Sequence, residues 1–352
     1  MQHKNSREEW KRVSQKINNC LVRKTKKLGV NMREYCFGVD VGGTTVKIGL
    51  IKTTGEIVEK WEIETDTSNN GENILGDICK SLDAKLDQWN LKPNDIEGIG
   101  IGLPGPVLAN GTVLNCVNLG WGTFNVTEKM SQLFHDVPVK ADNDANVAAL
   151  GEDWMGAGKK YSSIVMVTLG TGVGGGVIIN KKIVQGFNGG AGEIGHITVN
   201  EEETESCNCG RFGCLEQYCS ATGVVRLANR YLQSHGEPTK MRDINPLACR
   251  DVFNLAKEGD EAAANVVREM AECLGKGLSV IASVVNPQCF VIGGGVSKAG
   301  QYLIDNVERY YRASCFAPCS NAEVKLAELG NDAGIIGAAA LVSRSEEKVI
   351  LD

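Results

Sequence analysis

Four side chains of types that bind metals are concentrated in one short stretch of the chain. Cys207, Cys209 and Cys214 form the pattern C-x-C-x4-C, and His196 lies eleven residues before the first of them. One histidine and three cysteines make a complete tetrahedral ligand set for zinc. Zinc sites more often use C-x2-C pairs, so the spacing alone leaves a metal site and incidental cysteines as equal alternatives.

The cysteine content of the whole chain argues against a disulfide framework. There are 13 cysteines, an odd number at irregular spacing, and no signal peptide precedes them. This usage is typical of cytosolic proteins, in which thiols stay reduced. No apolar run reaches the roughly 20 residues that a membrane-spanning helix needs. We therefore predict a cytoplasmic protein without a membrane partner.

Three glycine-rich turns are the second group of residues that suit a particular chemistry. They lie at residues 40–47 (DVGGTTVK), 168–176 (TLGTGVGGG) and 291–297 (VIGGGVS), each with an apolar strand pattern. Glycine leaves backbone N–H groups uncovered and threonine adds a hydroxyl donor, an arrangement that binds phosphate oxygens. Neither a Walker A motif nor a dinucleotide motif is present. One such turn is usually a plain hairpin, but three together predict a phosphate site.

The charge is unevenly distributed. The chain of 352 residues has a formal net charge of −6, which gives no general reason to expect nucleic-acid binding. Residues 1–34, however, carry ten Lys or Arg against three acids. The simplest interpretation is a solvated, partly helical extension, and a basic arm for nucleic acid or membrane is the alternative. Because Met32 directly precedes the first strand pattern, translation starting there is a further hypothesis, and we expect residues 1–31 to be dispensable.

The elements that must position these residues follow a repeated plan. Residues 35–64 predict three strands joined by glycine turns, residues 72–89 a helix and residues 96–107 a buried strand. Residues 137–157 predict a strand and then a helix, and residues 161–186 again predict three strands joined by turns. A plan that occurs twice predicts two α/β domains that face each other across a cleft.

Six segments resemble, in their order along the chain, the signatures of the ROK family of sugar kinases and repressors. They are DVGGTTVKIG, ADNDANVAALGE, TLGTGVGGG, GGAGEIGHI, CNCGRFGCLE and VIGGGVSKAG. The resemblance runs from about Tyr35 to about Ser345. It implies the two-domain α/β fold of actin-like ATPases, which hexokinase and Hsp70 share, with an interdomain cleft and a zinc-binding loop.

The resemblance also implies domain boundaries. We expect a small domain over residues 35–145, joined by a returning C-terminal helix over 332–348, and a large domain with the zinc loop over 146–331. Residues 1–34 form an extension in this division.

The segments VNLGWG and NDAGIIGAA are most similar to the glucokinases of Gram-positive bacteria within the family. This similarity implies ATP-dependent phosphorylation of the 6-hydroxyl of glucose, with Mg²⁺ and a structural Zn²⁺ as cofactors. Kinases for N-acetylmannosamine, fructose, mannose or allose are the alternatives, and polyphosphate remains open as the donor. The resemblance implies a homodimer with no nucleic-acid partner.

The family's motifs assign roles to individual residues. Asp144 matches the general base, although an acid at this position could instead cap the following helix. Asp40 matches the acid that holds Mg²⁺ through water. The residues expected to bind the sugar are Gly105, Asn143, Asp144, Glu193, His196 and Glu216. The residues expected around the nucleotide phosphates are Asp40, Gly42, Gly43, Thr44, Lys47, Gly170, Thr171, Gly172, Gly293, Gly294 and Gly295.

The resemblance favours a metal site over incidental cysteines. His196, Cys207, Cys209 and Cys214 become the ligands of a closed zinc site, in which one ring nitrogen of His196 binds the metal and the other reaches a sugar hydroxyl. A repressor of the same family is the runner-up function. Its winged-helix DNA-binding domain needs several dozen residues before the first strand, and about 34 precede it here.

Overall fold

The computed structural model describes residues 33–344 of the chain. The proposed start at Met32 and nearly all of the basic extension lie outside these residues, as does the end of the predicted closing helix. The strands are β1 (Tyr35–Val41), β2 (Thr45–Lys52), β3 (Ile57–Glu64), β4 (Ile96–Leu103), β5 (Thr112–Val113), β6 (Phe124–Asn125), β7 (Val139–Asn143), β8 (Ile164–Leu169), β9 (Val173–Ile179), β10 (Lys182–Ile183), β11 (Cys289–Gly293) and β12 (Glu323–Leu326). The α-helices are α2 (Ile74–Gln88), α3 (Val126–Leu133), α4 (Asp144–Trp154), α5 (Glu216–Cys219), α6 (Ala221–Ser234), α7 (Cys249–Lys257), α8 (Glu261–Val285), α9 (Gln301–Ser314) and α10 (Ala333–Ser343).

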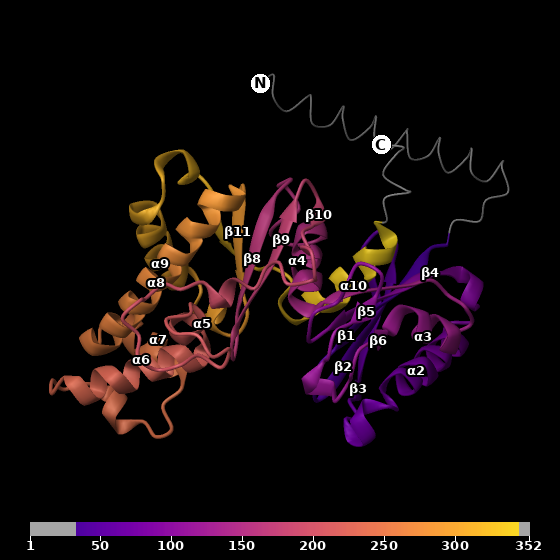
Figure 1. Ribbon diagram of the computed structural model, residues 1–352, viewed down its shortest axis with the longest axis horizontal. Coiled ribbons are helices and arrows are strands. Elements are labelled where there is room, and N and C mark those ends of the chain that lie inside the picture. The colour runs from indigo at the N-terminus through magenta and orange to yellow at the C-terminus, as the bar shows by residue number, and fades with distance from the viewer. Residues whose placement is uncertain (1–32, 345–352) are drawn as a thin grey trace.

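Two five-stranded sheets share one plan. Their strand orders are β3-β2-β1-β4-β7 and β10-β9-β8-β11-β12. In each sheet the first three strands along the chain pair antiparallel, and the next two add in parallel to the opposite edge. The repeated α/β plan predicted from the sequence is therefore present. Figure 1 shows the two sheets in two lobes, with the earlier part of the chain in one and the later part in the other.

The closing helix α10 returns from the end of the chain to the first lobe, where it packs against β1, β4 and α4 (Figure 1). Small residues allow this close approach. A Cβ added at Gly100 of β4 would collide with the backbone carbonyl of Ala338, and one at Gly337 of α10 would collide with that of Val147 in α4. The two helices and the sheet thus meet backbone to backbone.

Two neighbouring acids on α4 bind the chain on both sides of α10, before the helix begins and after it ends. The carboxylate of Glu152 is fully buried and accepts hydrogen bonds from the backbone amides of Glu328 (3.1 Å) and Leu329 (2.7 Å). The buried carboxylate of Asp153 accepts one from Arg344 at 2.9 Å. Buried carboxylates are tolerated only when they are paired or hydrogen-bonded in this way. These contacts could not be predicted from the sequence, because the partners lie far apart along the chain.

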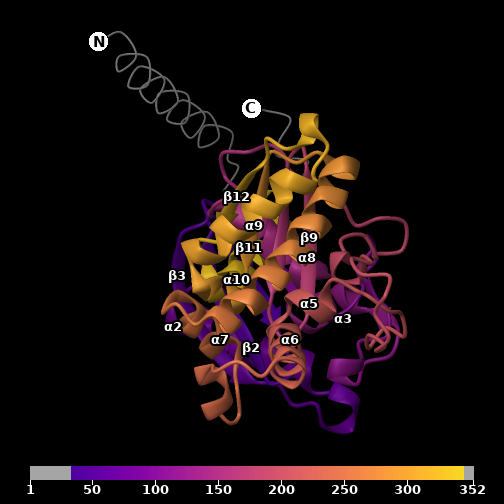
Figure 2. The ribbon, with the colours of Figure 1, turned by 90° about the vertical axis from the view of Figure 1, so that its left-hand side faces the viewer.

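Apolar side chains of the second sheet and of α6–α9 form the largest core, and the helices α8 and α9 cover one face of that sheet (Figure 2). The helix α8 supplies many of these side chains, but two valines near its end are exposed, Val280 at 47% and Val284 at 82%. Among residues 33–344 no helix is long and apolar enough to cross a membrane.

Candidate active site

Asp144 lies where β7 ends and α4 begins. The structure assigns the helix cap to its neighbour, because the Oδ1 atom of Asn143 accepts hydrogen bonds from the amides of Ala145 (2.9 Å) and Asn146 (3.4 Å). The alternative in which Asp144 serves as the cap is therefore wrong. Asn143 also donates through Nδ2 to the carbonyl of Gly105 at 3.2 Å. Asn143 is thus held against the loop of Gly105, which the family resemblance predicts to bind the sugar.

The electrostatic surroundings of Asp144 favour a proton acceptor. Its side chain is open to solvent, yet the protein around it limits hydration of the carboxylate. This desolvation, together with the nearby carboxylates of Asp40 and Glu193, raises the pKa of Asp144 to about 6. A carboxylate whose pKa lies close to neutral pH can both hold its charge and accept a proton. Carboxylate oxygens such as those of Asp40 are of the kind that Mg²⁺ prefers as ligands.

Asp40 occupies the end of β1, directly opposite Lys47 on β2. Burial raises the pKa of Asp40, and the charge of Lys47 partly opposes this shift. The carboxylate lies against the first turn of α10, where a Cβ at Gly334 would collide with its Oδ2 atom. The position of Asp40 therefore depends on a glycine almost three hundred residues away.

The first glycine turn is open at its tip. A hydrogen bond of 3.0 Å from the amide of Gly42 to the carbonyl of Thr45 closes the turn, and Gly43 and Thr44 remain exposed. A Cβ at Gly43 would lie 3.7 Å from the carbonyl of Asn118, so the segment VNLGWG approaches this turn.

The second and third glycine turns lie side by side. The strands β8 and β11 pair in parallel, with Gly293 opposite Thr168. Gly294 follows with a φ of +84°, and a Cβ there would collide with the backbone of Leu169. Gly294 and Gly295 are exposed, whereas Gly293 is buried in its strand. Gly293 therefore contributes close packing rather than an open amide.

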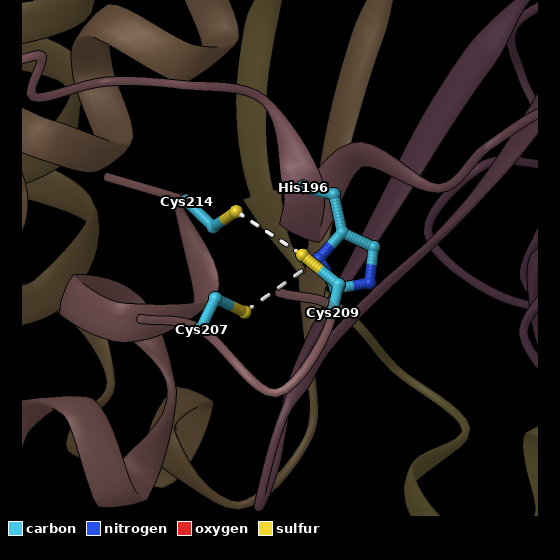
Figure 3. A group of neighbouring side chains, drawn as sticks. All are labelled: His196, Cys207, Cys209 and Cys214. Carbon is cyan, nitrogen blue, oxygen red and sulfur yellow. Dashed lines mark hydrogen bonds between the residues drawn. The ribbon is translucent and has the colours of Figure 1, made fainter. Parts of the chain in front are cut away.

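The four predicted metal ligands converge in the structure (Figure 3). One ligand atom from each of His196, Cys207, Cys209 and Cys214 lies within 4.8 Å of the others. The sulfurs of Cys209 and Cys214 are 3.7 Å apart, and the sulfur of Cys207 is 3.9 Å from Nδ1 of His196. A tetrahedral zinc ion with Zn–S bonds of about 2.3 Å separates two sulfur ligands by about 3.8 Å. The arrangement therefore fits zinc in type, number and spacing of ligands.

Glu216 connects this cluster to the second glycine turn. Its Oε2 atom accepts a hydrogen bond of 3.0 Å from the amide of Val173, and its Oε1 atom lies 3.8 Å from the sulfur of Cys207. A Cβ at Gly172 would collide with the same carboxylate. The hydroxyl of Thr222 adds a hydrogen bond of 2.9 Å to the carbonyl of Thr171. The predicted sugar and phosphate residues thus meet here, a link that the sequence did not indicate.

Glu193 and His196 lie on one short turn. Glu193 is exposed and precedes the 3-10 helix Ile194–His196, and Nδ1 of His196 faces the cysteines. With Nδ1 directed at the cluster, Nε2 is the nitrogen left for another partner.

Comparisons with known proteins identify the family. The sequence profile of the ROK family matches residues 36–345. A curated glucokinase of Halalkalibacterium halodurans is 43% identical over 317 residues, which are 89% of this chain and 96% of that protein. The xylose repressor of Caldicellulosiruptor bescii is 29% identical over 87% of this chain and 77% of the repressor.

A solved structure of a ROK family protein also matches this chain. The ROK family glucokinase from Streptomyces griseus in complex with glucose and AMPPNP matches with a TM-score of 0.71 and 33% identity, over 88% of this chain and 100% of that chain. The chain belongs to the ROK family. The predicted actin-like ATPase fold of the ROK sugar kinases is confirmed.

Proposed function

We propose that this chain is a glucokinase that transfers the γ-phosphoryl group of ATP to the 6-hydroxyl of glucose. The observation that carries the proposal is the carboxylate of Asp144, whose pKa is raised to about 6, beside Asp40 and Glu193 in a chain 43% identical to a glucokinase. The glucokinase from Streptomyces griseus was solved with glucose and AMPPNP, which supports the same substrate pair here.

In the proposed reaction, Asp144 accepts the proton of the 6-hydroxyl while the sugar oxygen forms a bond to the γ-phosphorus and ADP leaves. Such transfers depend mostly on positioning and on neutralising the charge of the phosphates. Mg²⁺, held through water by Asp40, would supply part of that neutralisation. The amides of the turns at Gly43–Thr44, Thr171–Gly172 and Gly294–Gly295 would bind the phosphate oxygens, while the amides of Gly42 and Gly170 donate within their own turns.

The sugar would lie between Asn143 and the metal cluster. Glu193, Glu216 and Nε2 of His196 offer acceptors and a donor for its hydroxyls. Acceptors that the bound sugar buries would reject analogues that lack a hydroxyl. Zn²⁺ at His196 and the three cysteines would fix the ring of His196. Four protein ligands complete a tetrahedral site, so its role is structural.

We further propose a cytoplasmic homodimer with the domain boundaries and the cleft expected above. The exposed Val280 and Val284, one turn apart on α8, support a contact between copies. Light scattering on the purified protein measures this state, and a monomer at all concentrations would contradict it.

A panel of hexoses tests the substrate. ADP release is measured with ATP and Mg²⁺ on glucose, N-acetylmannosamine, fructose, mannose and allose, and polyphosphate is tested as an alternative donor. We expect the highest kcat/KM for glucose. A higher value for another hexose would keep the kinase and change its substrate. The repressor alternative is weaker, because the xylose repressor shares 29% identity against 43% for the glucokinase.

A further inference from the structure

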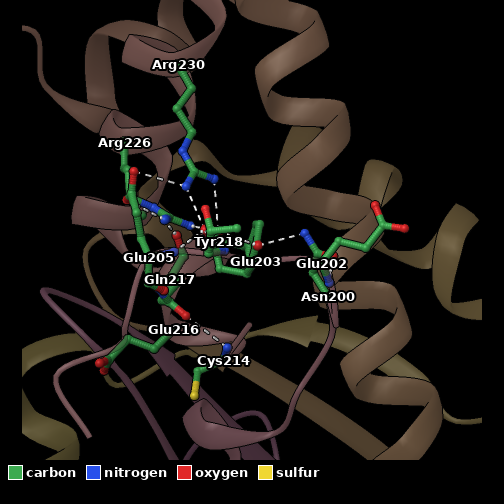
Figure 4. Close-up of polar contacts among 12 residues, drawn as sticks. Asn200, Glu202, Glu203, Glu205, Cys214, Glu216, Gln217, Tyr218, Arg226 and Arg230 are labelled. Atoms are coloured by element: carbon green, nitrogen blue, oxygen red, sulfur yellow. Dashed lines mark hydrogen bonds and ion pairs between the residues drawn. The ribbon is translucent and has the colours of Figure 1, made fainter. Parts of the chain in front are cut away.

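Glu203 lies in the loop between His196 and Cys207, and no motif of the sequence points to it. Its side chain is only 1% exposed. It accepts hydrogen bonds from the hydroxyl of Tyr218 at 2.6 Å and from Nη2 of Arg226 at 2.9 Å. Arg230 donates to both carboxylate oxygens, at 2.9 and 2.6 Å (Figure 4).

These contacts fully satisfy a buried charge. The backbone amides of Thr204 and Glu205 each donate to Oε1 of Glu203 at 3.0 Å. The hydrogen bonds of Arg230, Tyr218 and the neighbouring groups hold the pKa of Glu203 well below its usual range, although burial opposes the shift. A two-pronged pair of arginine and carboxylate is strong and directional. We call Glu203, Glu205, Tyr218, Arg226 and Arg230 the Glu203 cluster.

Gln217 joins the Glu203 cluster to both arms of the metal-binding loop. The first arm is the segment before Cys207, and the second arm is the segment after Cys214. The side chain of Gln217 accepts from the amide of Cys214 at 3.1 Å and donates to the carbonyl of Glu205 at 2.9 Å. Arg226 donates through Nε to the carbonyl of Gln217 at 3.2 Å and through Nη1 to the carboxylate of Glu205 at 2.9 Å. Helix α6, which carries both arginines, thereby holds the arm before Cys207 and the arm after Cys214.

We propose that Glu203 is a positioning residue, which sets the spacing of the cysteines before a metal binds and aims Glu216 at its partners. Glu216 directly precedes Gln217, so any movement of the second arm moves its carboxylate. The three cysteines and His196 supply the ligand atoms, and the Glu203 cluster supplies the rigid frame. The inference for the sugar rests on the proposed function, whereas the inference for the metal does not.

The test compares Glu203→Gln with Glu202→Gln in the full chain. Glutamine keeps the shape of the side chain but removes the charge that two arginines require, whereas Glu202 is exposed and serves as the matched control. Zinc affinity is measured by competition with a chromogenic chelator, without any assay of activity. We expect Glu203→Gln to bind zinc about 10- to 100-fold more weakly, as for the loss of groups that orient metal ligands. Glu202→Gln should match the parent.

A second readout compares the change in the KM for glucose with the change in the KM for ATP. For Glu203→Gln we expect a raised KM for glucose with a smaller change in the KM for ATP, which a general loss of stability would not produce. If Glu203→Gln does not fold, Arg230→Gln removes both hydrogen bonds of the two-pronged pair from a half-exposed position and leaves Arg226 in place. It should show the same changes to a smaller degree.

Parent-like zinc affinity in a folded Glu203→Gln or Arg230→Gln protein would overturn the proposal. Weaker zinc binding with an unchanged KM for glucose would uphold the positioning of the metal loop and contradict the assignment of His196 and Glu216 to the sugar.

Discussion

At the scale of single residues, Asp144 combines a position and an environment that few carboxylates share. It begins α4 and leaves the cap position to Asn143, and its Oδ1 atom accepts one hydrogen bond of 2.8 Å from the amide of Ala145. If it is the base, Asp144→Asn should lower kcat by about 10²- to 10⁴-fold, since an amide cannot accept the proton. Glucose binding, measured by calorimetry, should largely survive.

Unchanged turnover in Asp144→Asn would move the base elsewhere, and Glu193 would be the next candidate. Its carboxylate lies close enough to Asp144 to raise the pKa of that residue.

The raised pKa of Asp144 predicts a dependence on pH. A general base acts in its deprotonated form, so kcat/KM should fall as the pH drops through about 6. An aspartate of ordinary pKa would place the same inflection at about 4. The profile of kcat/KM between pH 4 and 8 distinguishes the two on the scale of about two units. An inflection near 4 would mean that burial and neighbouring carboxylates do not act on this group as described.

The types and spacing of single residues predicted that His196 and the three cysteines converge, as the structure shows, because short motifs carry their own chemistry. The role of Asp144 follows from the family resemblance and stays a prediction. Contacts that depend on the fold escaped the sequence. The arginines that bind Glu203 lie 23 and 27 residues away, and the amides before α10 that bind Glu152 lie 176 and 177 residues away. An acid with such distant partners looks in the sequence like any surface acid.

At the scale of elements, the start of α10 positions Asp40. In Gly334→Ala a Cβ would displace the carboxylate of Asp40, so we expect a lower kcat and a higher requirement for Mg²⁺. Gly76→Ala is the control, because Gly76 lies in helix α2 with no heavy atom within 4 Å of an added Cβ. It should keep parent activity and gain up to about 1 kcal/mol of helix stability. Parent-like kinetics in Gly334→Ala would show that Asp40 moves without consequence.

The metal-binding loop is the second element whose position matters. Cys209 is exposed, so Cys209→Ser should remove a ligand without opening a cavity in the core. We expect little zinc by elemental analysis, and glucose binding weaker by about 10- to 100-fold. Nucleotide binding should change less, because the ladder of β8 and β9 holds the second glycine turn even though Glu216 also contacts it.

Cys249→Ser provides the control for the loop, since Cys249 lies at the start of α7 outside the metal cluster. It should retain one zinc per chain. Full activity on glucose in a parent protein without zinc would contradict the structural role of the metal and leave the cysteines incidental.

Most strands of both sheets were predictable, because short apolar runs are separated by glycine turns. The edge strand β12 was not predicted. The link between Glu216 and the second glycine turn was not, because it joins elements through one side-chain hydrogen bond and a missing Cβ. Neither feature leaves a periodic pattern in the sequence.

At the scale of the whole molecule, two lobes of the same plan are joined by α4 and by the returning α10. The glycines between these helices leave no room for side chains, so α4 and α10 pack backbone to backbone. In the proposed reaction, closure of the lobes over the sugar would exclude water, which would otherwise hydrolyse ATP. The sequence predicted this architecture through its repeat, but the residues that fix α10 to α4 became visible only in the fold.

The most direct test of the account is product analysis on the purified full chain with glucose, ATP and Mg²⁺. Phosphorus NMR should show glucose 6-phosphate and ADP forming in equal amounts, with negligible ADP when glucose is left out. Release of ADP without a sugar phosphate, or phosphate at another hydroxyl of glucose, would contradict the proposed reaction and the role given to Asp144.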